Sequence, residues 1–407
     1  MIKTILFLFT FISISLANPL QDAIDNAPAY ATLKLPAGIY SGNIIINKPL
    51  TIMGKEPNVI IKGENSARVI TINSSYVKLN NLTITDSGNQ MITLDSAIQI
   101  KKANYCEVSN CKLLNSLYGI DLMMANHTLI SNNYITSKKN DIEFRGDAIK
   151  IWYSNNNIIK NNTIDSVRDT TLTYSNHNLI KNNTFTNNRF ALHLSMSHNN
   201  ILEENSLKYN SVGIMLMMAK DTKIVKNSVF SSTGAASMGI LLKNTENILL
   251  KNNSIKYNAV GIYIDTKHTQ AGMQRKILNN TIAYNKEALN FHAAIKNNTI
   301  VGNNIYANID DVVKSARSDV TYLNIIEKNY WDMYSGFDKN KDNIGDTSHK
   351  IYQYADQLWH YDHKVKFFYA SPLFSLLNFL ANLAPFVEPV LILEDKKPLV
   401  EPLHLLL

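Results

Sequence analysis

The sequence predicts an all-β protein: a right-handed parallel β-helix of about ten coils, followed by a short tail with one helix and an extended arm. Three observations support this fold. A polar phrase with paired asparagines returns along most of the chain, a short aliphatic phrase alternates with it, and the segments between them lack the 3.6-residue period of a helix. Such a unit cannot bury its apolar side alone, so successive units stack around a continuous core.

The first 17 residues predict a secretory signal peptide. Lys3 supplies a cationic start, the segment 5–16 is almost wholly apolar, and the small residues Ser15 and Ala17 suit signal peptidase. No later segment reaches the roughly 18 to 20 apolar residues of a membrane-spanning helix. We therefore expect an exported, soluble protein. Its net charge of +7 comes from lysines scattered over the repeats, which favours a solvated face and argues against a nucleic-acid partner.

The repeats extend over residues 18–328. Equivalent short strands of successive coils are expected to pair in parallel, about 4.8 Å apart, and the asparagine amides to form hydrogen-bonded columns. The first asparagine of each polar phrase stands at Asn132, Asn161, Asn182, Asn227, Asn252, Asn279 and Asn297, with Glu204 in that place once. The aliphatic phrases begin at Gly119, Ala148, Ala191, Gly213, Gly239 and Gly261.

The two ends of the repeat array need caps, because an open end would expose the apolar core. The first strands are predicted within residues 31–35, 42–46 and 59–61, and a short helix over Gln21–Ala27 is predicted to cover the N-terminal end. The pattern stops near Tyr330, so residues 329–407 form the tail. Ser371 and Pro372 predict the start of a helix that Pro385 ends, and we expect this helix to cap the core rather than to dock on a partner.

A loop in the tail carries oxygen side chains at alternating positions. Such a loop is suited to Ca²⁺, which prefers several oxygen ligands on a sharply turned backbone, although the final glutamate of an EF-hand is replaced by His349. A polar turn stabilised by side-chain hydrogen bonds explains the same pattern equally well. The candidate calcium ligands are Asp338, Asn340, Asp342 and Asp346.

Several stretches resemble the NosD family of periplasmic nitrous oxide reductase maturation proteins. These are residues 146–169, 193–198 and 329–389, and the tail phrases are the most specific part, since the coils match many β-helices of the pectin-lyase type. The resemblance implies a non-enzymatic periplasmic protein, peripheral to the inner membrane through an ABC-type permease (NosY) with its ATPase (NosF). It also implies a role in assembling the copper–sulfur centre of nitrous oxide reductase, with the reductase or a copper chaperone as further partners.

Soft donors suited to Cu(I) gather in corresponding positions of several coils. Met217 and Met218 follow Gly213 at the same offsets at which Met123 and Met124 follow Gly119, which predicts a common column. Methionines in such a stripe more often fill a core than bind metal, and Cys106 and Cys111 are expected to be isolated structural thiols. The candidate copper ligands are Met123, Met124, His193, Met196, His198, Met215, Met217 and Met218.

Exported β-helices are often polysaccharide lyases or hydrolases, so an enzymatic or sugar-binding function is the alternative. Glycoside hydrolysis needs two suitably spaced carboxyl groups. The best acidic cluster lies in the longest repeat and consists of Asp141, Glu143, Arg145 and Asp147, with Lys150, Trp152, Arg168 and Asp169 in the following strands. No column of carboxylates extends beyond it, and we therefore expect no catalytic site.

Overall fold

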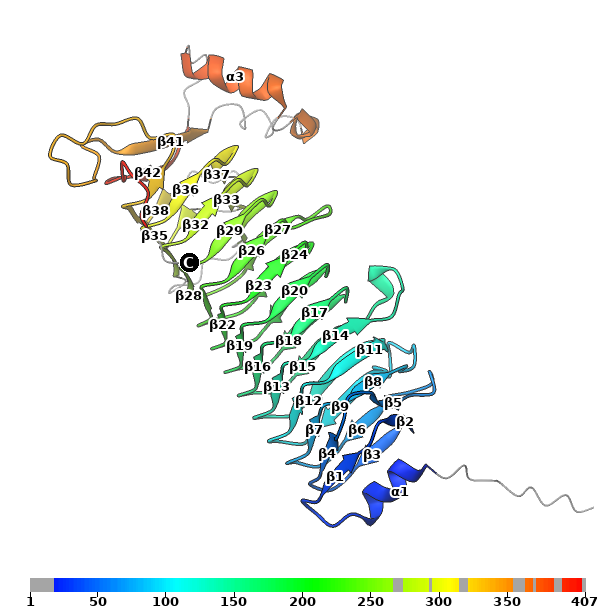
Figure 1. Cartoon of the computed structure of the whole chain (residues 1–407). Helices are drawn as coiled ribbons and strands as arrows, with labels where there is room; N and C mark the ends of the chain where they lie inside the picture. The colour runs from blue at the N-terminus through cyan, green and yellow to red at the C-terminus, as the bar shows by residue number, and fades with distance from the viewer. Residues whose placement is uncertain are drawn as a thin grey trace, which may run out of the picture.

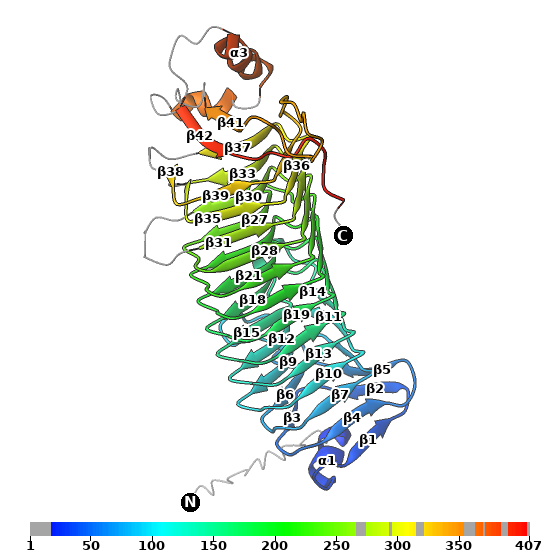
Figure 2. The same ribbon diagram turned by 90° about the vertical axis from the view of Figure 1, so that its left-hand side faces the viewer.

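The structure is a computed structural model that describes residues 18–265, 274–292, 295–314, 321–353, 363–368, 371–383 and 390–404. The predicted signal peptide lies outside the described residues, as do the tail phrases at 355–359 and 384–386. The described chain forms a long parallel β-helix whose coils stack into a rod (Figures 1 and 2). No helix within these ranges is long and apolar enough to cross a membrane.

Three parallel sheets run along the rod, and each coil adds one strand to each of them. The first, sheet A, contains 13 strands in an unbroken order along the chain. Its strands are β1 (Thr32–Leu35), β4 (Thr51–Gly54), β7 (Lys78–Asn80), β10 (Glu107–Ser109), β13 (Leu129–Ser131), β16 (Ile158–Lys160), β19 (Leu179–Lys181), β22 (Ile201–Glu203), β25 (Lys223–Val225), β28 (Ile248–Lys251), β31 (Arg275–Leu278), β35 (Asn298–Val301) and β39 (Ile325–Glu327).

Sheet B also has 13 strands and follows sheet A around each coil. Its strands are short, which leaves room for the turns between the sheets. They are β2 (Gly38–Ser41), β5 (Val59–Lys62), β8 (Thr83–Thr85), β11 (Lys112–Ser116), β14 (Tyr134–Ser137), β17 (Thr163–Asp165), β20 (Thr184–Thr186), β23 (Ser206–Lys208), β26 (Ser228–Phe230), β29 (Ser254–Lys256), β32 (Thr281–Ala283), β36 (Asn304–Tyr306) and β40 (Tyr330–Trp331).

Sheet C has 12 strands and corresponds to the aliphatic phrase of the repeat. Most of its strands are longer than those of sheet B, so this sheet offers the broadest regular outer face. The strands are β3 (Ile44–Ile46), β6 (Ile70–Ile72), β9 (Ser96–Lys101), β12 (Tyr118–Met123), β15 (Ile149–Trp152), β18 (Asp169–Thr173), β21 (Phe190–Ser195), β24 (Val212–Met217), β27 (Met238–Lys243), β30 (Val260–Asp265), β33 (Glu287–Phe291) and β37 (Asp310–Lys314).

The fold class is confirmed, and the number of coils is larger than the ten or so predicted. Before Asn132 the asparagine phrase differs: Asn81 and Asn110 adopt the left-handed turn conformation, but Leu82 and Cys111 stand where a ladder asparagine follows in later coils. The early strands are confirmed as β1, β3 and β5. The N-terminal helix α1 (Pro19–Asn26) buries Leu20 and Ile24 over the open end of the core, as expected for a cap.

Close contact between neighbouring coils explains the small residue that begins each aliphatic phrase. A Cβ atom on Gly213 would lie 2.6 Å from the carbonyl oxygen of Gly239, and one on Gly239 would lie 2.6 Å from that of Gly261. Glycine avoids these close contacts, and the positions that follow it alternate between the core and the outer face. Ile214 and Leu216 therefore point inward and are fully buried.

A column of buried asparagines holds the corner between sheets A and B. Each amide donates from Nδ2 and from its backbone N–H to the Oδ1 atom of the asparagine in the next coil, as Asn162 does to Asn183 at 2.9 Å for both bonds. The same Nδ2 also donates to a carbonyl of the preceding coil, here Ile130 at 3.0 Å. The column contains Asn133, Asn162, Asn183, Asn205, Asn227, Asn253, Asn280, Asn303 and Asn329.

The ladder residue is the second asparagine of the pair, whereas the first one makes the turn. Asn132, Asn161 and Asn182 adopt φ values of 54–56°, the left-handed region that asparagine tolerates. Two predicted positions were therefore wrong. Asn227 belongs to the ladder, and Asn297 belongs to the preceding corner, between sheets C and A. Both corners need a left-handed residue followed by a ladder residue, so the same phrase fits either one.

The C-terminal end of the core is closed by an antiparallel ribbon, β41 (His349–Gln353) with β42 (Val390–Asp395). Ile392 and Leu393 of β42 are buried beside the fully buried Trp331. The remaining elements are the 3₁₀ helices η1 (Ile142–Phe144) and η3 (His363–Phe368), the helix α3 (Pro372–Leu383), and the two-strand pair β34 (Ile295–Lys296) with β38 (Thr321–Tyr322).

The predicted tail helix is confirmed as α3, but it does not close the core. Its leucines are largely exposed, with Leu373 and Leu383 at 57% and 68% exposure. The helix lies beyond β41 at the C-terminal end of the rod (Figures 1 and 2). The ribbon β41–β42 carries out the capping that we expected of the helix.

Asp395 ends the asparagine ladder. Its Oδ2 atom accepts hydrogen bonds from the backbone N–H and the Nδ2 of Asn329, at 3.1 and 2.9 Å, and from Nε1 of Trp331 at 3.0 Å. Within the described ranges no further coil follows Asn329, so its acceptor comes from the tail. A carboxylate suits this place because it accepts without adding a donor that would need a partner of its own.

Candidate functional site

The outer face of sheet C brings the central candidate ligands together. His193 on β21 and Met215 on β24 are register partners, so their Cα atoms lie about 4.8 Å apart. Their neighbours Leu194 and Leu216 point into the core, which directs His193 and Met215 outward. An imidazole and a thioether in this arrangement match the donor preference of Cu(I).

His193 has a buried imidazole nitrogen, Nε2, without a hydrogen-bond partner among the described residues. The ring packs edge-on against Phe190, with the centroids 5.4 Å apart. Burial lowers the pKa of His193, although the negative charges of Asp169 and Asp147 act in the opposite direction. The ring is therefore neutral at pH 7, the form that coordinates metals.

Three more methionines lie in the same two coils. Met217 on β24 is the register partner of Ser195 and points outward. Met196 and Met218 occupy the following turn in consecutive coils, with φ values of 47° and 51°, and the backbone N–H of Met196 donates to the carbonyl of Met217. These five residues form what we call the Met/His cluster: His193, Met196, Met215, Met217 and Met218.

Met123 and Met124 do not belong to this cluster. They lie on and after β12, which β15 and β18 separate from β21, so about 14 Å divides the two groups at the usual strand spacing. Met123 and Met124 occupy the predicted positions within their coil. In the two coils between β12 and β21, however, Trp152 and Thr173 occupy the column of Met123. The eight candidate ligands are therefore not one site.

His198 lies in the turn before sheet A rather than on the face of sheet C. Its Nδ1 atom accepts the backbone N–H of Lys220 at 3.2 Å, and the backbone N–H of His198 donates to Oδ1 of Asn176 at 2.7 Å. It thus replaces an asparagine in a second ladder. This role accounts for His198 without a metal.

The methionines of sheet C do not fill the core, contrary to the more common role we expected. The buried apolar cluster of the described residues is built from Ile, Leu, Val, Ala, Phe, Trp and the two cysteines. Cys106 and Cys111 are free thiols in that cluster, and burial raises their pKa to about 11 and about 12. They are protonated structural residues rather than metal ligands.

A buried ion network lies next to the Met/His cluster. Arg168 donates from its terminal nitrogen to Asp147 at 2.8 Å and lies 3.6 Å from Asp169, and Arg189 donates to Asp169 from Nε at 3.0 Å and from its terminal nitrogen. Thr171 donates to the second oxygen of Asp147 at 2.8 Å. The carboxylates of Asp147 and Asp169 are only 3% and 2% exposed.

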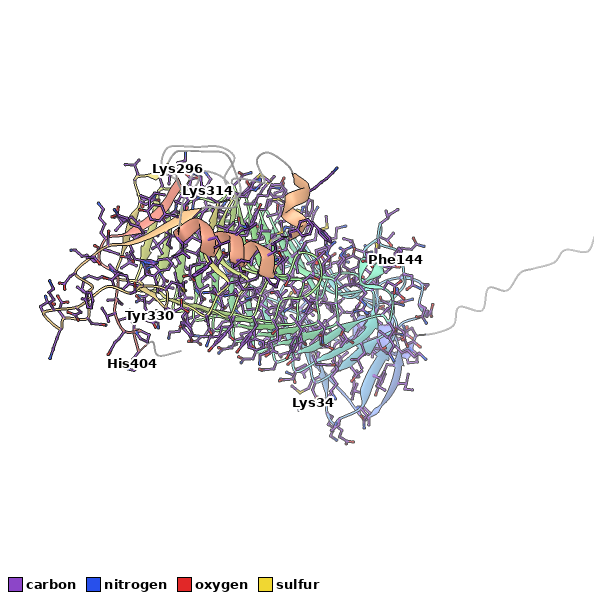
Figure 3. The ribbon with its side chains drawn as sticks, turned by 90° about the horizontal axis from the view of Figure 1, so that it is seen from above. Lys34, Phe144, Lys296, Lys314, Tyr330 and His404 are labelled. Atoms are coloured by element: carbon purple, nitrogen blue, oxygen red, sulfur yellow. The ribbon has the colours of Figure 1, made fainter. Side chains whose placement is uncertain are left out.

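The network differs from the acidic site that we considered for catalysis. Asp141 and Glu143 are exposed on the loop that carries η1, and Phe144 at its tip lies far from the C-terminal residues Tyr330 and His404 (Figure 3). Asp147 and Asp169 already accept from two arginines. Burial raises the pKa of Asp147 against the lowering effect of Arg168. This geometry is that of a structural network.

Sequence reasoning missed three members of this region. Arg189 and Tyr118 were not singled out, nor was Asp121, which accepts from Gln99 at 2.8 Å and whose pKa is raised by burial. Asp121 belongs to a column of sheet C in which Gln99, Asp121, Lys150, Thr171 and His193 are successive register partners. Aligning the aliphatic phrases residue by residue would have revealed Asp121, whereas Arg189 directly precedes β21 and Tyr118 begins β12, outside that column.

The proposed calcium loop is held by its own side chains. Asp338 accepts backbone N–H groups of Lys341 and Asp342 on one oxygen and of Asn343 on the other. Asp342 accepts the N–H of Ile344, and Asp346 that of Lys339. These hydrogen bonds are those expected of a polar turn that is stabilised by its own side chains. Within the described ranges, no group of three or more His, Cys, Asp or Glu side chains is arranged to hold a metal.

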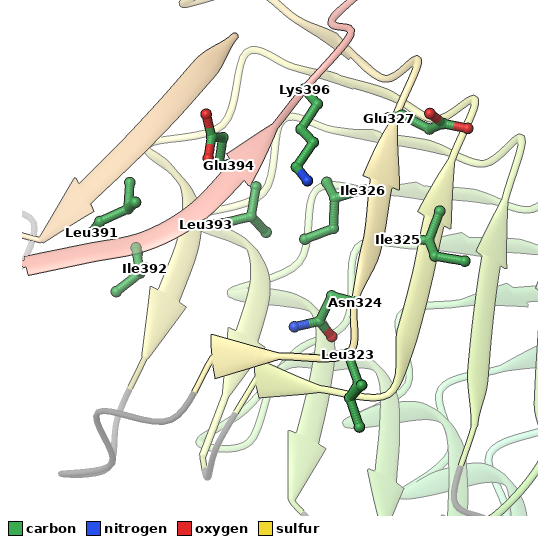
Figure 4. A pocket seen from close by; sticks show the side chains of 10 residues that line it. All are labelled: Leu323, Asn324, Ile325, Ile326, Glu327, Leu391, Ile392, Leu393, Glu394 and Lys396. Atoms are coloured by element: carbon green, nitrogen blue, oxygen red, sulfur yellow. The ribbon is translucent and has the colours of Figure 1, made fainter.

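A groove of about 580 Å³ lies at the C-terminal end of the rod, between β39 and β42 (Figure 4). Its walls are mainly aliphatic, with Ile325, Ile326, Leu391 and Leu393, and its charged residues are Glu327, Glu394 and Lys396. No methionine, histidine or cysteine is among the described residues that line it. It is therefore separate from the Met/His cluster in position and in chemistry.

Comparisons with known proteins agree on the fold and identify one family. The model of the family described as periplasmic copper-binding protein (NosD) matches residues 135–336, which include the Met/His cluster. Among curated proteins, none matches the chain closely enough to count as a relative.

Several solved β-helix structures are similar in fold. The A-module of mannuronan C-5 epimerase AlgE6 from Azotobacter vinelandii has a TM-score of 0.58 and 13% identity, over 78% of this chain and 94% of that one. A PL6 family polysaccharide lyase from Pseudopedobacter saltans has a TM-score of 0.52 and 15% identity, over 78% and 91%. A variant of the periplasmic alginate epimerase AlgG has a TM-score of 0.51 and 12% identity, over 77% and 83%. At such identities the likeness concerns the fold alone.

Proposed function

Because residues 135–336 identify the chain as a member of the NosD family, whose members are described as periplasmic copper-binding proteins, we propose that it serves in assembling the copper–sulfur centre of nitrous oxide reductase. In this proposal it is a non-catalytic partner of an ABC-type permease and ATPase, and it handles copper as cargo. The reductase or a copper chaperone is the expected donor or recipient. The copper-related accessory role follows from the family, and the remaining steps are our inference.

The observation that supports copper handling is the unpartnered Nε2 of His193 beside Met215. A buried nitrogen without a hydrogen bond is costly, by about 1–3 kcal/mol, unless a ligand uses it. Neutral imidazole and thioethers are soft donors that favour Cu(I) over harder cations. We therefore assign His193 and Met215, with Met217, as the ligands to test first, and Met196 and Met218 as neighbours able to receive the ion.

Polysaccharide binding or cleavage is the second candidate. Proteins of similar fold include a mannuronan C-5 epimerase module and a polysaccharide lyase, and the Asp147–Asp169 network lies beside the outer face of sheet C. However, hydrolysis or elimination requires carboxyl or basic groups that substrate can reach, and these carboxylates are buried and bound to Arg168 and Arg189. We rank this function below copper handling.

The test of the function uses a deletion strain of the native host. We expect the strain to lose nitrous oxide consumption and to yield reductase with a low copper content, both restored by the intact chain. Normal consumption with fully loaded reductase would rule out the maturation role. The polysaccharide alternative would then be tested by binding to acidic oligosaccharides.

A test of the ligand assignment compares two methionine pairs. Substituting Met217→Leu/Met218→Leu removes two thioethers from the Met/His cluster, and we expect Cu(I) affinity to fall at least about tenfold, a loss of about 1.4 kcal/mol. The matched control is Met123→Leu/Met124→Leu, which makes the same chemical change four strand steps away, at about 19 Å. Affinity is measured by competition with a chromophoric Cu(I) chelator. Equal affinities of the two variants would contradict the assignment.

A further inference from the structure

The helix α3 presents a continuous apolar surface to solvent. Its exposed side chains are 40–68% accessible, and it contains no charged residue. At 100° per residue the exposed apolar positions fall within an arc of about 160°, and the exposed Ser375 lies about 40° beyond its edge. They are Leu373, Leu376, Leu377, Phe379, Leu380 and Leu383.

Two aromatic residues extend this surface beyond the helix. Phe367 and Phe368 of η3 are 87% and 50% exposed and precede α3 in the chain. The apolar surface therefore covers a helix and a neighbouring 3₁₀ turn at the C-terminal end of the rod (Figures 1 and 2). Monomeric soluble proteins rarely leave so many large apolar side chains exposed together.

We propose that α3 and η3 lie in the headgroup region of an anionic phospholipid bilayer. The segment 363–383 contains two lysines and a histidine and no acidic residue, so its charge is complementary to that of anionic lipids. Interfacial helices that lie in the membrane plane combine a broad apolar side with basic residues, which here are supplied by η3. At 12 residues, or about 18 Å, α3 is too short to span a hydrocarbon core of about 30 Å.

A planar surface fits these residues better than a protein groove does. A groove that receives a helix contacts a narrow stripe of side chains at helical spacing. Here the exposed apolar arc covers nearly half of the helix, and Phe367 and Phe368 belong to a separate element, η3. The inference is independent of the copper assignment, because the Met/His cluster lies on coils far from α3.

The experiment is vesicle flotation of the full mature chain. We expect it to float with vesicles of phosphatidylethanolamine and phosphatidylglycerol (3:1) and to bind them more weakly in high salt or with phosphatidylcholine alone. Leu376→Gln/Leu380→Gln is expected to weaken vesicle binding at least about tenfold, because it removes two side chains that would be buried in lipid. The matched control Ile39→Gln/Ile92→Gln changes two exposed residues of the N-terminal half and should bind as the original chain does.

A second measurement locates the helix when binding occurs. Phe367→Trp should be quenched by phospholipids brominated in the upper part of the acyl chain. Absence of vesicle binding, or equal binding by both double variants, would overturn the proposal. Concentration-dependent dimerisation that only the α3 variant loses would assign the helix to a protein contact instead and would also overturn it. Cu(I) affinity of the same variants, expected to be unchanged, separates this outcome from failure of the proposed function.

Discussion

Replacing Arg168 by alanine is expected to destabilise the protein by about 3–5 kcal/mol, because it leaves two buried carboxylates without their shared partner. Arg168 is bound to Asp147 and lies against Asp169, and both carboxylates are almost inaccessible to water. Its own side chain is 21% exposed, so solvent screens the interaction only weakly. The loss is measured as a shift of the urea midpoint at pH 7.5.

The same variant should show a characteristic pH dependence. Burial already raises the pKa of Asp147 in the folded protein, and loss of Arg168 removes an influence that lowers it. A carboxyl group whose folded pKa lies above its unfolded pKa contributes stability below the unfolded pKa and loses it as pH rises. Arg168→Ala should thus be less destabilised at pH 5 than at pH 8.

The control variant is Lys160→Ala, which removes an exposed cation from the adjoining sheet. It should change the free energy of unfolding by less than about 0.5 kcal/mol. If the two variants unfold alike, the network is not structural.

Asp395→Ala is expected to open the C-terminal cap at a cost of about 3 kcal/mol or more. The substitution leaves the backbone N–H and Nδ2 of Asn329 and Nε1 of Trp331 without an acceptor, and both residues are fully buried. Each buried unsatisfied donor costs about 1–3 kcal/mol. The ribbon β41–β42 should then detach at lower urea concentration than the coils unfold, which Trp331 fluorescence and limited proteolysis of the tail both report.

Two variants make the interpretation of Asp395 specific. Asp395→Asn keeps one acceptor oxygen and should lose less stability than Asp395→Ala. Lys397→Ala changes an exposed neighbour and should behave as the original chain. A tail that is cleaved at the same rate in Asp395→Ala and Lys397→Ala would show that the ladder does not depend on this carboxylate.

The sequence predicted the architecture well because each coil repeats the same local structural requirements. Alternation of buried and outward residues, the small residue at the corner and the paired asparagines are local requirements that every coil repeats. The sequence could not distinguish the two corners that share the same turn, which is why Asn297 was placed at the wrong one. It also could not show that Asp395, 66 positions after Asn329, ends the ladder, since nothing local marks that contact.

The candidate site was predicted in part. His193 and Met215 were identified and are adjacent, but Met124 was grouped with them because offsets within a coil say nothing about the number of coils between two residues. The unpartnered Nε2 of His193 and the pairing of Arg189 with Asp169 depend on side-chain placement, which periodicity does not give.

The regular coil spacing makes the rod a molecular ruler. Five strand steps in sheet C separate His193 on β21 from the last strand, β37, a height of about 24 Å. The asparagine ladder joins neighbouring coils through identical hydrogen bonds, and its last asparagine is bound by a carboxylate from the tail. Coils can therefore be added or removed without a new cap. One inserted coil would raise the Met/His cluster by about 4.8 Å relative to the C-terminal end. Any partner that holds this end would then meet the cluster at a height set by the number of coils.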